Sequence, residues 1–192
     1  MANLSEFLKK KYHYLFHQFY DSNKNGVITH SDFVEMIKSL QKLRKWTSGD
    51  DRLKACQDTL NKAWTALKRD ADTNKDNKVT IDEWYDYWSE FIARSKEADD
   101  GWPPTMDWVK DYMNFWFDLL DTSGDSFVDE NEFLQVCRYF NISDCEAKKA
   151  YQNINGGKPV DRDTFGRLWL EYMTSDDQAA PGNSVFGKTT WS

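Results

Sequence analysis

Residues 121–132 read DTSGDSFVDENE, and this stretch decides the fold of the chain. Its oxygen-bearing side chains stand at positions 1, 3, 5, 9 and 12, the spacing with which one short loop can wrap a hard divalent cation. Residues 21–32, DSNKNGVITHSD, and residues 72–83, DTNKDNKVTIDE, repeat the pattern, and a fourth, degenerate copy begins at Asn153. Four copies in one register indicate a repeated structural unit.

The spacing matches D-x-[DN]-x-[DN]-G-x₅-E, the EF-hand calcium loop, in which the loop joins two helices. Apolar residues on both sides of each loop recur with the period of an amphipathic helix. Position 8 is β-branched in all four copies, which suits short strands that pair neighbouring loops: Ile28, Val79, Val128 and Val160. The sequence therefore predicts a compact all-α fold of four helix–loop–helix units, paired into two lobes.

The GWPP at residues 101–104 interrupts the helical pattern between the second and third units. We expect an N-terminal lobe with EF-hands 1 and 2 at residues 1–100, and a C-terminal lobe with EF-hand 3 and the degenerate EF-hand 4 at residues 101–174. Residues 175–192 form a tail rich in Gly, Ser and Thr. We expect this tail to dock the side chains of Val185 and Phe186 into a groove of the core.

The bulk composition narrows the class of protein. The net charge of −7 favours a cation ligand and disfavours a nucleic-acid surface, which needs basic patches. The three cysteines, Cys56, Cys137 and Cys145, have no zinc or redox spacing and suit a reducing compartment. No apolar stretch has the length of a signal peptide core or a membrane helix. We therefore expect a cytoplasmic protein, a monomer, with calcium ions as its partners.

Each of the first three loops supplies side-chain oxygens and one backbone carbonyl as metal ligands. In the first loop the predicted ligands are Asp21, Asn23, Asn25, the carbonyl of Val27 and Asp32. In the second loop they are Asp72, Asn74, Asp76, the carbonyl of Lys78 and Glu83. In the third loop they are Asp121, Ser123, Asp125, the carbonyl of Phe127 and Glu132, with Asp129 acting through water. We expect three calcium sites, at which magnesium competes.

The loops differ at two positions that bear on affinity. Position 6 requires a positive φ and hence favours Gly, but it is Asn77 in the second loop and Ser126 in the third. Asn tolerates this region better than Ser. The third loop also carries the most carboxylates, so charge and strain oppose each other there. The first loop closes on Asp32, one methylene shorter than Glu, which favours magnesium relative to calcium.

The fourth loop, NINGGKPVDRDT, has lost the ligand pattern. Position 1 is Asn153, position 5 is Gly157 and position 12 is Thr164, while Lys158 adds a positive charge. We expect no metal in this loop. Its helices are still needed, because an unpaired hand would leave the apolar face of its partner exposed.

Two other motifs have simpler explanations. The tail segment GNSVFGKT, residues 182–189, matches the P-loop pattern, but phosphate binding needs a strand before the loop and a helix after it. Nucleotide binding therefore stays a remote alternative. His13 and His17 are four residues apart on one predicted helix, and with no third ligand evident a solvated helix face accounts for them.

The chain resembles the sarcoplasmic calcium-binding proteins of invertebrates, a group in which it is similar to calexcitin. The residues that carry the resemblance are DYMNFWFDLLDTSGDSFVDENEF at 111–133, NGGKPVDRDTFGRLW at 155–169 and GNSVFG at 182–187. The resemblance, which also includes the Asp that closes the first loop, implies metal in loops one to three, none in loop four, and a tail packed against the body. Ser126 departs from the Gly or Asn usual in the family.

The sequence bears on three functional classes: calcium buffer, calcium sensor and enzyme. A calcium sensor opens to show a Met-rich groove, whereas this chain has five Met among nine Trp, nine Tyr and twelve Phe, which favours a buffer. A calexcitin-like sensor acting on a protein or membrane target is the alternative. Calcium-triggered photoproteins group His, Trp and Tyr in a cavity, but the histidines here lie near the N-terminus, and no catalytic constellation is evident. We expect no enzyme.

Overall fold

The computed structural model describes residues 4–191, and helices make up most of the described chain. The first two hands consist of α1 (Glu6–Leu15), the π-helical turn η1 (Phe16–Tyr20), β1 (Val27–Ile28), α2 (His30–Arg44), α3 (Asp51–Ala71), β2 (Val79–Thr80) and α4 (Ile81–Ser95). The last two consist of η2 (Pro104–Met106), α5 (Trp108–Leu120), β3 (Phe127–Val128), α6 (Glu130–Tyr139), α7 (Asp144–Asn155), β4 (Val160–Asp161), α8 (Arg162–Thr174) and η3 (Pro181–Ser184). The prediction of four helix–loop–helix units is confirmed.

Loop positions 9 and 12 also begin the helix that leaves each loop. In α4, the hydroxyl of Thr80 accepts a hydrogen bond from the amide of Glu83, and the Glu83 side chain accepts one from the Thr80 amide. Asp129 and Glu132 form the same capping box at the start of α6. Such a reciprocal cap satisfies amides that a helix otherwise leaves unpaired. The residue that closes the loop therefore also fixes where the helix starts.

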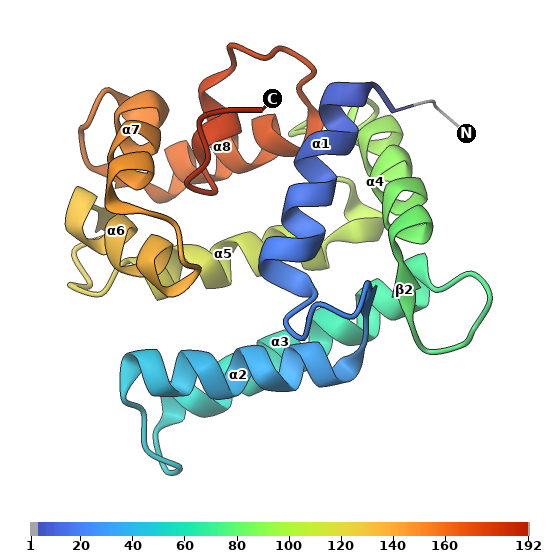
Figure 1. Cartoon of the computed structure of the whole chain (residues 1–192), viewed down its shortest axis with the longest axis horizontal. Helices are drawn as coiled ribbons and strands as arrows, with labels where there is room; N and C mark the ends of the chain where they lie inside the picture. The colour runs from blue at the N-terminus through green and yellow to red at the C-terminus, as the bar shows by residue number, and fades with distance from the viewer. Residues whose placement is uncertain (1–3, 192) are drawn as a thin grey trace.

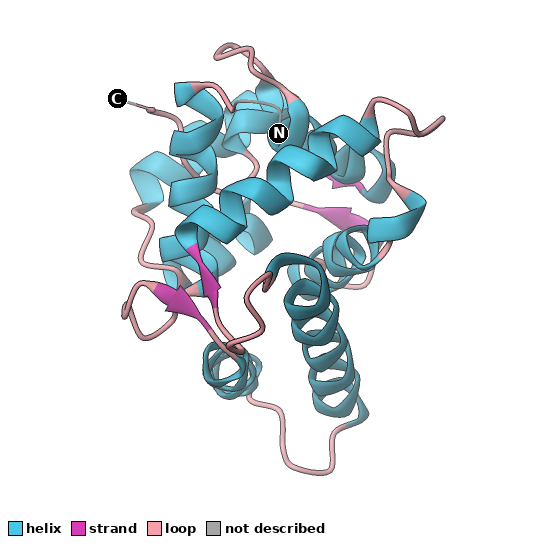
Figure 2. Ribbon diagram, turned by 90° about the vertical axis from the view of Figure 1, so that its right-hand side faces the viewer, coloured by secondary structure: helices cyan, strands magenta, loops and turns pink. Residues whose placement is uncertain are grey.

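The short strands pair the loops as the sequence predicts. Strands β1 and β2 are antiparallel, with Ile28 opposite Val79, and β3 and β4 are antiparallel, with Val128 opposite Val160. Figure 2 shows the two strand pairs well apart from one another. All four β-branched residues at position 8 are buried, which explains why this position stays apolar even in the degenerate loop.

One continuous apolar core runs through both pairs of hands. Helix α3 packs against α5 and α4 packs against α8, so contacts cross the predicted lobe boundary. The segment between α4 and α5 contains only the short turn η2. Figure 1 shows the helices gathered around α1 and α5. The division at residue 100 stays a prediction, and the predicted domains also include residues 1–3 and 192, which lie outside the described residues.

The tail folds back onto the body of the molecule. Val185 is buried, and the ring of Phe186 lies against the rings of Phe19, Trp169 and Tyr172. The expected docking of these two side chains is confirmed. No helix in the described part of the chain has the length and apolar character needed to span a membrane.

Candidate metal centre

The aspartate at position 1 organises each of the first three loops. Both carboxylate oxygens of Asp21 accept backbone amides of their own loop, from Asn25 at 3.0 Å and from Gly26 at 2.9 Å. Asp72 accepts the amides of positions 5 and 6 in the same way, and Asp121 those of positions 4 and 6. Each aspartate ends the entering helix, so the helix end and the loop are fixed by one side chain.

The residue at position 6 has a left-handed backbone in all three loops. The φ angle is 84° at Gly26, 63° at Asn77 and 71° at Ser126. A side chain in this region is strained unless it is small and polar, and Asn tolerates it better than Ser. The positive φ expected at position 6 is confirmed, and the strain at Ser126 is a feature of the folded chain.

Side chains at positions 3 and 5 brace the turn. The Asn23 amide oxygen accepts the amide of Asn25, whose own side-chain oxygen accepts the amide of Val27. The second loop repeats both contacts through Asn74 and Asp76. In the third loop Asp125 accepts the amide of Phe127, while the Ser123 hydroxyl donates to Asp121. Phe127 is 45% exposed, so its ring is not part of the apolar core.

The residue at position 12 ties together the two ends of its loop. Glu83 Oε1 accepts the amide and hydroxyl of Thr73 at the start of the loop, and Oε2 accepts the amide and hydroxyl of Thr80 near its end. Four hydrogen bonds use the lone-pair sites of one carboxylate. A cation bound by Glu83 would therefore replace some of these hydrogen-bond donors.

The other two closing residues do the same with different partners. Glu132 Oε1 accepts the Thr122 amide and hydroxyl and the Ser123 amide, and Oε2 accepts the Asp129 amide. The shorter Asp32, fully buried, accepts the amide of Asn23 at 3.3 Å and the amide and hydroxyl of Thr29 at 2.8 Å. Although its side chain is one methylene shorter than that of Glu, Asp32 therefore still joins the two ends of its loop.

Hydrogen bonding keeps the closing glutamates ionised. Burial alone would raise the pKa of Glu83, but hydrogen bonds from Thr80 and Thr73 outweigh it and leave the pKa below its ordinary value. The pKa of Glu132 is lowered in the same balance, burial against hydrogen bonds from Asp129, Ser123 and Thr122. Both side chains are therefore anionic at neutral pH, as cation binding requires.

The acidic side chains are not drawn together within the loops. Among residues 4–191, no three His, Cys, Asp or Glu side chains lie close enough to one another to hold a metal ion. Two facts explain this: only some of the predicted ligands in each loop are acidic side chains, and the closing carboxylates face backbone amides and hydroxyls. The donor set itself, hard oxygens at the five spaced positions, fits calcium and magnesium rather than zinc.

The fourth loop is held by contacts of another kind. The Tyr151 hydroxyl donates to the carbonyls of Val128 and Lys158, which joins the third and fourth loops. Asp161, at position 9, caps α8 by accepting the Thr164 amide, so the helix start survives without a closing carboxylate. Asn153, at position 1, donates to the hydroxyl of Ser184 in the tail.

One contact at the first loop was not predicted from the sequence. His17 Nδ1 lies 3.3 Å from Asp21 Oδ2. The histidine pair, His13 on α1 and His17 on η1, therefore lies next to the first loop. The rings of His13 and His17 are 4.4 Å apart between centroids. Burial, and then the neighbouring His17, lower the pKa of His13. The four-residue spacing of His17 and Asp21 was the available signal.

The tail segment that matches the P-loop pattern lacks the elements that phosphate binding needs. The 3-10 turn η3 opens it, and no helix follows within the described residues. The amide of Thr189 donates to Glu146, and Lys188 Nζ lies 4.8 Å from the centroid of the Tyr14 ring. The Thr189 amide and the Lys188 ammonium group therefore have their partners within the protein.

Comparison with known proteins agrees with this geometry. The family model described as EF hand matches residues 69–86, which span the second loop. Over 187 residues the chain is 33% identical to the sarcoplasmic calcium-binding proteins I, III and IV of Branchiostoma lanceolatum, covering 96% of this chain and 98% of the relative. It is 25% identical to calexcitin-1 of Caenorhabditis elegans, covering 97% of this chain and 89% of the relative.

Solved structures give the same answer. A sarcoplasmic calcium-binding protein from amphioxus superimposes with a TM-score of 0.81 at 29% identity and covers 98% of this chain and 100% of that chain. A light-sensitive photoprotein superimposes with a TM-score of 0.64 at 16% identity, covering 92% of this chain and 86% of that chain, which supports the fold alone.

Paired hands and three oxygen-rich loops define a calcium-binding protein of the EF-hand class. Within that class, the chain belongs to the sarcoplasmic calcium-binding protein family. Its close relatives are calcium-binding proteins, not enzymes.

Proposed function

We propose that the chain is a calcium buffer of the cytoplasm with three cation sites, in loops 21–32, 72–83 and 121–132, and none in the fourth loop. The observation that carries the proposal is the shared architecture of the three loops. In each, an aspartate at position 1 gathers the loop amides and a carboxylate at position 12 joins the loop ends. The fourth loop has neither carboxylate.

A buffer differs from a sensor in how much apolar surface it shows when calcium binds. Here the core is rich in stiff aromatic side chains, and the tail covers part of it. Contacts between α3 and α5 and between α4 and α8 join the two pairs of hands. Opening a hand would disrupt these contacts, so we favour a buffer that acts as a monomer.

Binding of an apolar dye such as anilinonaphthalene sulfonate separates the two functions. For a buffer we expect dye fluorescence to change by less than about twofold between EGTA and saturating calcium, since little apolar area becomes exposed. A variant with Glu83→Gln and Glu132→Gln serves as the matched control that has lost two closing carboxylates. A large calcium-dependent rise in the wild-type chain alone would instead identify a sensor with a protein or membrane target.

Magnesium should compete most strongly at the first site. Asp32 is the shortest of the three closing residues and supplies fewer ligand oxygens to a large cation. Calcium titrations with and without millimolar magnesium would show the effect as a weakened first-site affinity. An unaltered first-site affinity would argue against it.

A further inference from the structure

The fourth hand has no carboxylate at loop positions 1 and 12, so the two ends of its loop are not joined as they are in the other three hands. Position 1 is Asn153 and position 12 is Thr164, neither of which is a carboxylate. The turn η3 of the tail packs against both α7 and α8. Figure 1 shows the end of the chain lying between α8 and α1. The tail therefore occupies a position from which it can bridge the hand.

Two polar contacts join the tail to α7. The side-chain amide of Asn153 donates to the Ser184 hydroxyl at 3.2 Å, so the residue at loop position 1 contacts the tail. Near the other end of α7, Glu146 Oε1 accepts both the amide and the hydroxyl of Thr189, at 2.7 and 2.6 Å. The tail is thus held along the length of this helix.

The tail backbone also lies directly on α8. The amide of Gly182 donates to Glu171 Oε2 at 2.6 Å. A Cβ atom at Gly182 would lie 2.6 Å from the carbonyl oxygen of Leu168, which leaves no room for any side chain there. The glycine is therefore required by the close approach of the two backbones.

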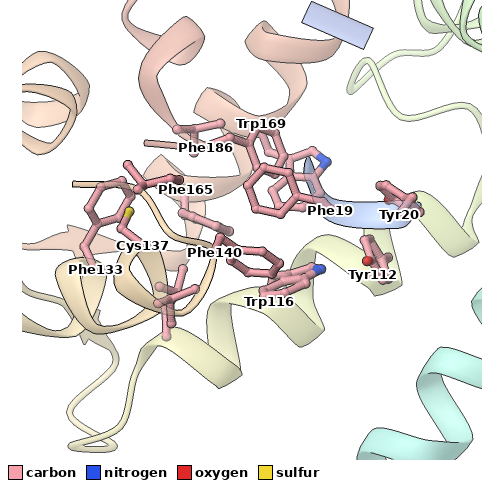
Figure 3. Close-up of a pocket in the computed structure, with 14 residues that line it drawn as sticks. Phe19, Tyr20, Tyr112, Trp116, Phe133, Cys137, Phe140, Phe165, Trp169 and Phe186 are labelled. Atoms are coloured by element: carbon pink, nitrogen blue, oxygen red, sulfur yellow. The ribbon is translucent and has the colours of Figure 1, made fainter. Parts of the chain in front are cut away.

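The apolar part of the tail closes a groove in the core. The Phe186 ring centroid lies 4.7 Å from that of Trp169 and 4.6 Å from that of Tyr172. Figure 3 shows Phe186 and Trp169 on one side of the cavity beneath the tail and Trp116 on the opposite side. Only about 40 Å³ of this cavity remains, room for a few water molecules. Val185 and Phe186 both line this cavity, so the tail forms part of its wall.

We infer that the fourth hand is a peptide-binding site in place of a metal site, and that residues 181–191 are its resident ligand. The ligand class is a short turn-forming peptide with an adjacent aliphatic and aromatic pair, glycines where its backbone meets the helices, and a hydroxyl for Glu146. This inference goes beyond the proposed function, because the site needs no cation. It also explains why the groove would stay closed at any calcium concentration.

Alkylation of cysteines by N-ethylmaleimide, located by mass spectrometry, tests the inference in the full chain. A Cβ at Gly187 would lie 2.9 Å from Cys137 Sγ, so the tail covers this thiol. Burial raises the pKa of both Cys137 and Cys56 to about 12, and Cys145 is exposed. We expect fast alkylation of Cys145 and slow alkylation of the other two, in EGTA and in calcium alike.

Replacing one glycine should lift the tail from the thiol. In Gly187→Ala, where φ is 75°, we expect alkylation of Cys137 to rise at least about tenfold with Cys56 unchanged. Gly156→Ala is the matched control, since Gly156 also has a positive φ, 61°, but a Cβ there meets no atom within 4 Å. If Cys137 stayed as slow as Cys56 both in Gly187→Ala and in a folded chain carrying Val185→Asp and Phe186→Asp, the tail would not cover the thiol and the inference would fail.

Binding in trans gives the second test. In a full chain carrying Val185→Asp and Phe186→Asp, the tail should leave the groove, and a labelled peptide of sequence PGNSVFGKTTW should bind and restore slow alkylation of Cys137. The same peptide with both aspartates is the control and should not bind. Absence of binding to a variant with wild-type circular dichroism and slow Cys56 would overturn the inference. If the variant loses its helical signal, the two glycine variants decide.

The outcome does not depend on the proposed function. A chain that binds no calcium by calorimetry yet shields Cys137 would contradict the buffer and leave the peptide site intact. A wild-type chain that binds calcium but is alkylated rapidly at Cys137 would contradict the peptide site and leave the calcium-binding function intact.

Discussion

Single residues carry the strain and the unusual charge of this chain. Ser126 has a φ of 71° in the third loop, where a side chain is unfavourable by on the order of 1–2 kcal/mol. Lys11, fully buried, donates to the Ser175 carbonyl at 2.6 Å and to Asn183 Oδ1 at 3.1 Å. Its ammonium also lies over the Tyr172 ring. The sequence shows the first feature through the loop register, but nothing in it marks Lys11.

Ser126→Gly should tighten calcium binding at the third site. Relief of the strained φ is expected to raise the affinity by about tenfold, since 1.4 kcal/mol corresponds to a factor of ten. Calorimetry on a chain whose first and second sites are disabled would measure the change. Asn77→Gly in the second loop is the comparison and should gain less, because Asn tolerates this region. Equal or weaker binding in Ser126→Gly would show that the turn is not strained.

Lys11→Met should remove a pH dependence of stability. Burial lowers the pKa of Lys11 to about 8, despite the opposing charges of Asp176 and Glu171, whereas the unfolded chain keeps its proton up to about 10.5. Between these values the unfolded state binds more protons, so stability rises with pH. We expect a gain of about 1 kcal/mol from pH 7 to 9 in the wild type and none in Lys11→Met.

Urea unfolding at several pH values measures this difference. Lys10→Met, at an exposed position on the same helix, should keep the wild-type slope. A Lys11→Met protein whose stability follows the wild-type curve would contradict the assignment of the slope to the buried ammonium.

At the scale of elements, the loop and the following helix share their residues. Position 9 caps the helix and position 12 completes the capping box while joining the loop ends. The spacing T-x-x-E was visible at Thr80 and Glu83, and it predicts the helix start. The closing carboxylates accept hydrogen bonds from backbone amides and hydroxyls. The calcium-loop pattern did not predict these bonds, because it assigns the same carboxylate oxygens to the metal.

Asp32→Glu should change the metal preference of the first loop. The added methylene gives the closing carboxylate the reach to offer both oxygens to a large cation, which favours calcium over magnesium. We expect the calcium-to-magnesium selectivity of this site to rise about tenfold, which corresponds to 1.4 kcal/mol. Calcium titrations with and without magnesium measure it, and Asp32→Asn, which removes the charge, should abolish the preference together with most of the binding. Unchanged selectivity in Asp32→Glu would mean that side-chain length is not the determinant.

At the scale of the molecule, periodicity and loop register predicted the four hands and the strand partners. The docking of Val185 and Phe186 was expected from the apolar residues of the tail. They did not predict what the tail contacts. Asn153 to Ser184 and Glu146 to Thr189 are long-range pairs of common polar residues, and no local pattern marks them. The contact of His17 with Asp21 lay within reach, since both residues stand four apart along one helix and its end.

We propose that the molecule binds three cations, one in each of the first three loops, and none in the fourth loop. Isothermal titration of the full chain with calcium, in the absence of magnesium, tests this count most directly. The account predicts three bound ions per chain, falling to two in Glu83→Gln or in Glu132→Gln. A fourth bound ion, or three ions retained in both variants, would contradict it.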